Sequence, residues 1–333
     1  MIVVTGGAGF IGSALLWSLN KRGREDIVVV DERDKIRQTK NLASLRYAGY
    51  LDKDTFIEQL EKDVFGDRIE ALLHMGACSS TTETDAEYLM ENNFHYTRRI
   101  GTWQAAHQTC RFIYASSAAT YGNGERGYSD DEDTLETLQP LNLYARSKQQ
   151  YDLYAKEQGW LSHSVGLKYF NVFGPNENHK GDMRSVINKA YPDVRDKAKM
   201  FLFKSYREGY GDGEQRRDFI YIKDAVAMTL FFLDKPKIQG IFNIGAGCAR
   251  SWNDVAHALF KASNVDGTIE YIPMPETLRD KYQYYTCADM HKLYSVGCTH
   301  ECMSLEDAVR DYVTRYLEPD HYLGMSDTVM SFQ

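Results

Sequence analysis

The stretch Met1-Ile-Val-Val-Thr-Gly-Gly-Ala-Gly-Phe-Ile-Gly12 decides the fold of this chain. Residues 1–4 predict a short buried strand, and Leu15, Leu16 and Leu19 predict the apolar face of a helix that follows the glycines. A strand, a glycine-rich turn and a helix together form a cradle for a pyrophosphate, because glycines let the backbone approach the phosphates and the helix N-terminus supplies unpaired N–H groups. This context makes the glycine motif more specific than its letters alone.

The next predicted strand, residues 26–31, ends in an acidic side chain. Asp31 lies about twenty residues past the glycines, where an acidic residue reaches the adenosine ribose hydroxyls of a dinucleotide. That position favours NAD. Basic residues follow at once, however, and could meet the 2′-phosphate of NADP; they are Arg33, Lys35, Arg37 and Lys40. From these residues the choice between the two cofactors stays open.

Buried-type runs recur at residues 69–74, 111–115, 165–170 and 241–245. They predict an α/β fold, a doubly wound parallel (Rossmann) sheet with a smaller C-terminal α/β substrate lobe. Alternation of strands and helices weakens after Asn171-Val-Phe-Gly-Pro175. We therefore expect a dinucleotide-binding domain at 1–172 and mainly a substrate lobe at 173–333, with about 215–245 returning to the first domain.

A candidate catalytic group lies at Tyr144-Ala-Arg-Ser-Lys148. A Tyr and a Lys four residues apart share one side of a helix, where the ammonium can lower the pKa of the phenol from its usual value near 10. Ser117, just after the strand at 111–115, can hydrogen-bond a substrate oxygen that gains or loses a proton. The paired arginines Arg216 and Arg217 suit a diphosphate; the alternative is an ordinary ion pair with Asp218.

The composition of the 333 residues is that of a globular protein, with 43% hydrophobic and 26% charged residues. A net charge of −8 without a basic run argues against general nucleic-acid binding. No apolar run is long enough to span a membrane, and the N-terminus enters a strand at once, which leaves no room for a signal peptide. Six scattered Cys predict reduced thiols in the cytoplasm. Cys298, His300 and Cys302 lack a fourth ligand, so we expect no metal site.

Four motifs together resemble the extended short-chain dehydrogenase/reductase family of nucleotide-sugar enzymes, over residues 1 to about 312. They are Thr5-Gly-x-x-Gly-x-x-Gly12, Ser117, Tyr144-x-x-x-Lys148 and Arg217-Asp-Phe-x-Tyr-x-x-Asp224. Three further stretches are similar to the members of that family that epimerise an ADP-heptose at C6 for lipopolysaccharide core synthesis. These are His74-x-Gly-Ala-Cys-Ser-Ser-Thr-Thr-Glu83, Ala115-Ser-Ser-Ala-Ala-Thr-Tyr-Gly122 and His179-Lys-Gly181.

The resemblance implies an isomerase with bound NADP (NAD possible) that removes hydride from C6 and returns it to the other face of the ketone. Two acid/base residues are implied, Tyr144 and Lys180, supported by Lys148 and Ser117. The open alternatives are a nucleotide-sugar 4-epimerase, which does not require the His179-Lys180 loop, and a non-catalytic nicotinamide-binding regulator, which would usually lack the Tyr–Lys pair. A dehydratase is poorly supported, because Ala118 and Ala119 follow Ser117 where such enzymes need an acid and a base.

The resemblance also implies binding residues, position by position. For the cofactor we expect Gly6, Gly9, Phe10, Ile11, Gly12, Asp31, Glu32, Lys53, Met75, Gly76, Ala77, Cys78, Ser79, Asn92, Lys148, Val172 and Lys180. For the nucleotide-sugar substrate we expect Ser117, Asn171, Asp182, Lys189, Phe203, Lys204, Ser205, Tyr206, Arg217 and Tyr282. Four positions depart from the family's usual residues, namely Gln38, Met75, Asp182 and Lys189. Related enzymes form rings, so a homo-oligomer such as a pentamer is implied.

Overall fold

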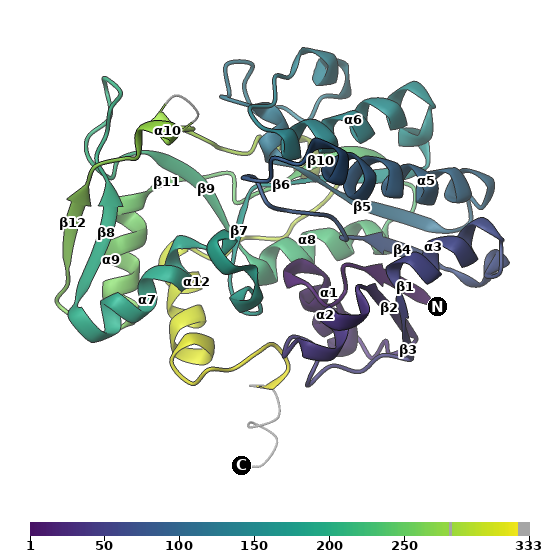
Figure 1. Cartoon of the computed structure of the whole chain (residues 1–333), viewed down its shortest axis with the longest axis horizontal. Coiled ribbons are helices and arrows are strands. Elements are labelled where there is room, and N and C mark those ends of the chain that lie inside the picture. Colours follow the sequence, from purple (N-terminus) through teal and green to yellow (C-terminus); the bar gives the residue numbers. More distant parts are fainter. Residues whose placement is uncertain (280–281, 326–333) are drawn as a thin grey trace.

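The computed structural model describes residues 1–279 and 282–325, and its main feature is a central parallel sheet with helices on both faces (Figure 1). Within the described residues this sheet has seven strands in the order β10-β6-β5-β4-β1-β2-β3. All its neighbouring strands run parallel, so the predicted doubly wound α/β fold is confirmed. The strands are β1 (Ile2–Thr5), β2 (Ile27–Asp31), β3 (Gly49–Asp52), β4 (Ala71–His74), β5 (Arg111–Ser117), β6 (Ser164–Tyr169) and β10 (Gly240–Ile244).

Two groups of helices cover the central sheet. Helix α1 packs on α8 against one face, and α3, α5 and α6 pack side by side against the other (Figure 1). Every residue of β1, β4, β6 and β10 is buried, as expected for a parallel sheet covered on both sides. These helices are α1 (Phe10–Lys21), α3 (Lys53–Glu61), α5 (Tyr96–Ala106), α6 (Leu143–Glu157) and α8 (Ile222–Asp234).

Two smaller sheets lie beside the central one (Figure 1). One has the order β11-β9-β7 and the other pairs β12 with β8. Their strands are β7 (Asn171–Phe173), β8 (Lys199–Phe203), β9 (Arg216–Tyr221), β11 (Ala249–Ser251) and β12 (Thr268–Ile272). The remaining α-helices described are α2 (Arg33–Gln38), α4 (Ala86–Leu89), α7 (Val186–Lys197), α9 (Trp252–Ala262), α10 (Glu276–Arg279), α11 (His291–Ser295) and α12 (Leu305–Tyr312).

The chain leaves the central sheet after β6 and returns to it through α8 and β10. The boundary between a domain at 1–172 and a lobe at 173–333 stays a prediction, and residues 280–281 and 326–333 of that lobe lie outside the described residues. No helix in the described part of the chain is long and apolar enough to cross a membrane.

The strand order reverses between β1 and β4, and this reversal positions the site. Ligands of open α/β sheets bind outside the carboxyl ends of the strands at such a switch point. Here the glycine turn follows β1, the segment Met75–Ser79 follows β4, and Ser117 is the last residue of β5. The three segments therefore meet at the carboxyl ends of these neighbouring strands.

Candidate active site

The glycine turn after β1 fits a pyrophosphate. Gly6 has a φ of +65°, and a Cβ added to it would lie 2.7 Å from the Gly76 Cα, so the turns after β1 and β4 touch backbone to backbone. At Gly12 an added Cβ would lie 2.1 Å from the Gly6 carbonyl oxygen. The amides of Phe10, Ile11 and Gly12 open helix α1 without an acceptor in the described part of the chain. Unpaired N–H groups at a helix N-terminus attract phosphate.

Asp31 at the end of β2 holds this turn in place. Its carboxylate accepts hydrogen bonds from the Ala8 amide at 3.1 Å and from the Glu32 amide at 2.9 Å. Burial raises the pKa of Asp31. Glu32 forms an ion pair of 3.1 Å with Lys35, and Lys53, the first residue of α3, pairs with Asp54 at 3.0 Å. Both signs of charge therefore lie near the expected adenosine end of the cofactor.

Ser117, Tyr144 and Lys148 line one cavity of about 390 Å³. Asn142 caps α6 by accepting from the Ala145 amide at 2.8 Å, so the helix begins at Leu143, one residue before Tyr144. The Ser117 side chain lies beside the Tyr144 phenol and lowers the pKa of that phenol against the effect of burial. The Lys148 amine donates to the Ala115 carbonyl at 2.9 Å. The three predicted residues are thus brought together.

The pKa of Tyr144 corrects one expectation. Burial raises the pKa of its phenol, and the neighbouring Ser117 side chain only partly opposes that rise. Burial also lowers the pKa of Lys148 to about 8, with the Asp152 carboxylate acting in the opposite direction. The expectation that Lys148 would lower the pKa of Tyr144 is therefore wrong for this structure, because loss of solvent outweighs the charge of a lysine that is itself buried.

Asp152 holds helix α6, which carries Tyr144 and Lys148, against the neighbouring strands. It lies one turn after Lys148 on α6 and is fully buried. Its carboxylate accepts from the Tyr114 hydroxyl at 3.0 Å, the Ser116 hydroxyl at 2.6 Å and the Lys168 amine at 3.0 Å. This network fixes α6 to β5 and β6, the strands that carry Ser116 and Lys168.

Lys180 reaches the same cavity from a distant segment. It lies in the 3-10 turn Asn178–Met183, after β7, and lines the cavity with Asn171 and Val172. Its Nζ lies 5.1 Å from the centre of the Phe10 ring. Burial lowers the pKa of the Lys180 amine, and the Glu177 carboxylate opposes that change. A lysine so placed can exchange a proton more readily than a solvated one.

Asn93, which the sequence did not single out, positions the segment after β4. The buried Asn93 amide accepts from the Cys78 N–H at 2.8 Å and donates to the Cys78 carbonyl at 3.0 Å and to Ser147 at 3.0 Å. The predicted Asn92 instead donates to the Tyr88 carbonyl at 2.8 Å. Met75, Ala77 and Ser79 from this segment line the cavity, whereas Gly76 packs on Gly6.

Arg217 is a buried cation suited to an anionic ligand. Its guanidinium lies 5.1 Å from the centre of the Tyr282 ring, and Tyr282 packs edge-on against Phe203. Asp218 turns instead to the backbone amides of Ala246, Gly247 and Ala288. The alternative of an Arg217–Asp218 ion pair is therefore wrong, and within residues 1–279 and 282–325 Arg217 has no carboxylate partner.

The other predicted substrate residues, like Phe203, Arg217 and Tyr282, do not line the cavity that holds Tyr144. The Lys204 amide donates to Ile272 at 2.9 Å, that of Ser205 to Asp212 at 2.7 Å, and that of Tyr206 to the Tyr284 hydroxyl at 3.0 Å. Lys189 donates to the Asp182 carbonyl at 3.0 Å, so these two residues lie together. None of the five lines the cavity that holds Tyr144.

Several cavity residues were missed from the sequence, including Phe219, Trp252 and Gln283. Phe219 lies two residues after Arg217 on β9, so strand alternation could have placed it on the same face. Trp252 begins α9 and donates to the Tyr282 hydroxyl at 2.9 Å. No local pattern marks Trp252 or Gln283, because both reach the cavity through contacts distant in sequence.

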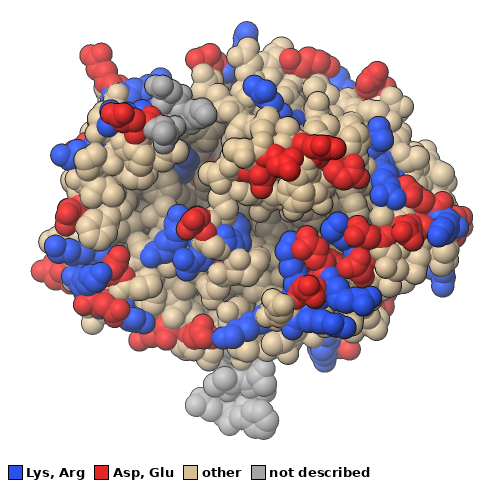
Figure 2. Space-filling model, in the orientation of Figure 1, with Lys and Arg blue, Asp and Glu red and all other residues tan. Residues whose placement is uncertain are grey.

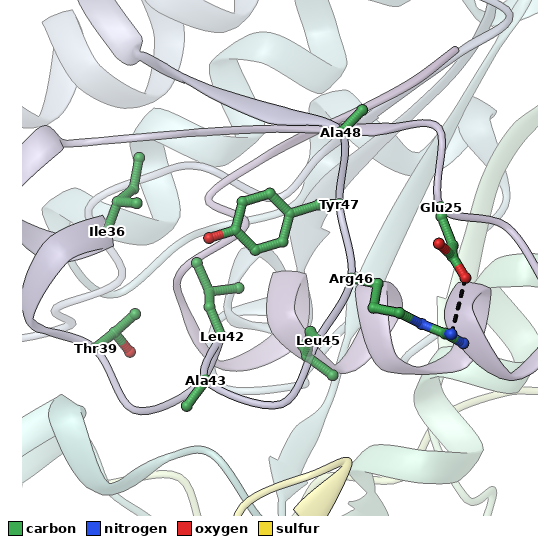
Figure 3. A pocket seen from close by; sticks show the side chains of 9 residues that line it. All are labelled: Glu25, Ile36, Thr39, Leu42, Ala43, Leu45, Arg46, Tyr47 and Ala48. Atoms are coloured by element: carbon green, nitrogen blue, oxygen red, sulfur yellow. Dashed lines mark ion pairs between the residues drawn. The ribbon is translucent and has the colours of Figure 1, made fainter.

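A second, larger hollow of about 640 Å³ lies near α2 and contains none of the predicted site residues (Figure 3). Its apolar lining includes Ile36, Leu42 and Tyr47, and Arg46 pairs with Glu25 at 3.0 Å beside it. The candidate site is therefore placed by chemistry rather than by size.

Acidic and basic side chains are interspersed over the face in Figure 2. In the described part of the chain no cluster of three or more His, Cys, Asp or Glu could hold a metal ion.

This chain is similar to a family of epimerases and dehydratases and to several named epimerases. Residues 2–245 match the model of the NAD dependent epimerase/dehydratase family. The ADP-L-glycero-D-manno-heptose-6-epimerase of Nitratidesulfovibrio vulgaris strain Hildenborough is 52% identical over 95% of this chain and 98% of its own length. The enzyme of the same name from Fusobacterium nucleatum is 46% identical over 97% of this chain and 100% of its own. The crystal structure of the Helicobacter pylori ADP-L-glycero-D-manno-heptose-6-epimerase superposes with a TM-score of 0.78 at 26% identity, covering 94% of this chain and 95% of that one.

Proposed function

Because the chain belongs to the NAD dependent epimerase/dehydratase family, we propose that it is the isomerase that converts ADP-D-glycero-D-manno-heptose into ADP-L-glycero-D-manno-heptose. The named relatives at 52% and 46% identity support this substrate and reaction. The structural observation that carries the proposal is the meeting of Lys180 with Tyr144 and Ser117 in one cavity. The product would serve the synthesis of lipopolysaccharide core precursors.

The residues that would hold the cofactor fit a nicotinamide dinucleotide. The unpaired amides of Phe10, Ile11 and Gly12 would meet its pyrophosphate, and Asp31 with Glu32 would lie toward its adenosine ribose. Met75 and Val172 line the cavity beside Tyr144, where a nicotinamide ring would lie. When bound, a nicotinamide would supply the redox chemistry of the reaction, as acceptor and then donor of the hydride at C6 of the heptose.

The protein's own groups then have to move protons on two sides of one carbon. The C6 oxygen keeps its bond to carbon: it loses its proton when the ketone forms, and it regains a proton after the ketone has turned its other face to the hydride. The oxygen occupies different positions in these two steps, so we assign the two proton transfers to two residues. Tyr144 would exchange the proton on one side with Ser117 holding the substrate oxygen, and the Lys180 amine would exchange it on the other. Burial lowers the pKa of Lys180, which raises the fraction of neutral amine available to accept a proton. Arg217 would bind the diphosphate.

The test is incubation of the purified protein with ADP-D-glycero-D-manno-heptose without added cofactor, followed by NMR of the C6 proton. Conversion to the L-glycero epimer is expected and would also demonstrate tightly bound cofactor. Absence of conversion even with NAD⁺ or NADP⁺ supplied would overturn the proposal. UDP- and GDP-sugars in parallel reactions test the 4-epimerase alternative, which has no need of Lys180.

A dehydratase and a regulator have less support. Ala118 and Ala119 line the cavity next to Ser117, where removal of water would need an acid and a base. A non-catalytic regulator would have no use for Ser117, Tyr144 and Lys148 together in one cavity.

For the form of the cofactor, we propose NADP on the family resemblance, with NAD as the second candidate. Arg33 and Arg37 in α2 support NADP because they follow β2 directly. Asp31 and Glu32 favour NAD because a 2′-phosphate beside two carboxylates is repelled. Heat release of the bound dinucleotide, followed by an assay for the 2′-phosphate, distinguishes the two.

We also propose a cytoplasmic protein and a homo-oligomeric ring, such as a pentamer. All six cysteines lie in the described part of the chain and are free thiols, which suits a reducing compartment. The ring rests on resemblance alone, and light scattering of the purified protein measures its size.

A further inference from the structure

Residues 176–179, the loop that leads to Lys180, make hydrogen bonds with segments distant in sequence. Asn176 has a φ of +76°, a conformation that non-glycine residues adopt at a cost. Glu177 is fully buried, and its carboxylate accepts hydrogen bonds from the Ser185 hydroxyl at 2.7 Å and from the amides of Ser185 and Gly174. Such a conformation persists only where surrounding contacts fix it, so the question is which residues supply them.

Residues 312–323, here called the clamp segment, supply a hydrogen bond to each of three consecutive loop residues. The Tyr312 hydroxyl donates to the Glu177 carboxylate at 3.0 Å. The Leu323 amide donates to the Asn176 side chain at 2.9 Å. The Asn178 side chain donates to the Tyr322 hydroxyl at 3.3 Å. The loop next to the proposed proton carrier is thus attached to the far end of the described chain.

A second attachment joins the same loop to the cofactor side. The buried Asn41 amide donates to the Ala8 carbonyl at 3.0 Å, to the Asn176 carbonyl at 3.1 Å and to His179 Nδ1 at 3.2 Å. Asn176 in turn donates to the Ser13 hydroxyl of α1 at 3.0 Å. The loop is therefore held between the glycine turn and the clamp segment, and Lys180 is the next residue after this frame.

We propose that the clamp segment is a positioning element for catalysis, with Tyr312 and Tyr322 as positioning residues that hold Lys180 at its reacting distance from the sugar. This proposal rests on the proposed function, in which Lys180 exchanges a proton. Tyr312 is 1% and Tyr322 is 8% exposed, and the Tyr312–Glu177 hydrogen bond is buried, so removal of the Tyr312 hydroxyl leaves a buried carboxylate with one partner fewer. A misplacement of about 1 Å costs roughly a hundredfold in rate.

The test compares Tyr322→Phe, Tyr312→Phe and the double variant with Tyr316→Phe. Tyr316 is also buried in the clamp segment, and its hydroxyl forms no hydrogen bond with residues 176–178. Each Phe variant keeps the ring and removes only a hydroxyl, so folding should be preserved. The first readout is amide hydrogen exchange of residues 176–185, which is independent of activity. Faster exchange is expected in the Tyr322 and Tyr312 variants but not in the Tyr316 variant.

The second readout separates positioning from general damage. Epimerisation should fall about tenfold or more in the double variant. The amount of bound cofactor should stay within about twofold of wild type. The same holds for the reduced nicotinamide that appears in a single turnover with the epimer whose proton Tyr144 exchanges. Unchanged hydrogen exchange or unchanged epimerisation would overturn the proposal. Equal loss of hydride transfer and epimerisation, or loss of cofactor, would also overturn it by revealing a structural role only. Failure of the wild type to convert the heptose would instead refute the proposed function, and the exchange result would still stand.

Discussion

The Nζ of Lys180 lies 5.1 Å from the centre of the Phe10 ring. Phe10 is the first residue of α1, and Lys180 belongs to the turn after β7, so two segments far apart in sequence close over one cavity. A lysine ammonium is attracted to the face of an aromatic ring, and this attraction persists when the ammonium is partly desolvated. The contact therefore ties the proposed second proton carrier to the helix that would bind the cofactor pyrophosphate.

Replacing Tyr144 with Phe should remove most of the activity while cofactor stays bound. Only the hydroxyl is lost and the ring stays. General acid–base catalysis contributes about a hundred- to ten-thousandfold in rate. The measurement is conversion of the heptose at C6 by NMR, together with absorbance of bound dinucleotide. Tyr154→Phe on the same helix is the control, because Tyr154 does not line the cavity. Near-normal turnover of Tyr144→Phe would contradict the assignment of Tyr144 as an acid/base residue.

Lys180→Met should cripple epimerisation and spare partial redox exchange. Without the amine, the proton on one side of C6 has no carrier, whereas Tyr144 still serves the other side. Transient reduction of bound nicotinamide after mixing with substrate reports the surviving half of the reaction. Lys197→Met is the control, because Lys197 is an exposed residue that pairs with Asp193 at 2.7 Å. A fully active Lys180→Met enzyme would return the loop to an ordinary structural role.

Arg217→Gln should weaken substrate binding without loss of cofactor. A charge-assisted hydrogen bond contributes about 1.5–3 kcal/mol, so KM should rise roughly ten- to a hundredfold. The neighbouring Arg216 is exposed, and Arg216→Gln is the matched control. Isothermal titration with ADP measures the same effect apart from catalysis. Equal behaviour of the two variants would exclude a specific role for Arg217.

His74 should make stability depend on pH. It is buried between the Thr5 hydroxyl at 2.6 Å and the Thr97 hydroxyl at 2.9 Å. Burial, and secondly the charge of Lys148, lower its pKa to about 3 from 6.5. Between these values the unfolded state binds a proton that the folded state does not. The free energy of unfolding should therefore fall by up to about 1.4 kcal/mol per unit as pH decreases from 6.5 toward 3.

Urea titration at several pH values measures this slope. His74→Gln should flatten it relative to wild type, whatever its stability at neutral pH, because the variant has no titrating ring. His257 on α9 is exposed, and His257→Gln should leave the slope unchanged. Identical slopes for wild type and His74→Gln would show that other groups cause the dependence.

Local sequence patterns predicted the central sheet well because its strands are buried on both faces and read as apolar runs. β3 was not predicted because its four residues are not fully buried and form no apolar run. β8 was not predicted although it contains the apolar run Met200–Phe203, and in the structure the residues of this strand are alternately buried and exposed. Ser117, Tyr144 and Lys148 could be found because each lies at a strand end or on one face of one helix. Asn93 and Trp252 could not, because their roles depend on contacts with Cys78 and Tyr282 across the fold.

The raised pKa of Tyr144 marks another limit of sequence reasoning. The helical spacing correctly places Lys148 near the phenol, yet the direction of the pKa change follows from how much solvent the cavity excludes. That quantity depends on side chains from β5 and from the segments after β6, which no single motif contains. Spacing therefore predicts the partners of a titrating group better than it predicts its pKa.

The return of β10 to the edge of the central sheet has a consequence for protein engineering. Strand β6 gains its outer neighbour only after β7, β8 and β9 have been synthesised. On the ribosome, the sheet cannot be completed until residue 244 has emerged. A chimaera made with one crossover after residue 172 would pair β6 of one parent with β10 of the other. An exchange of substrate specificity between homologues thus needs two junctions, with α8 and β10 kept from the parent that supplies β6.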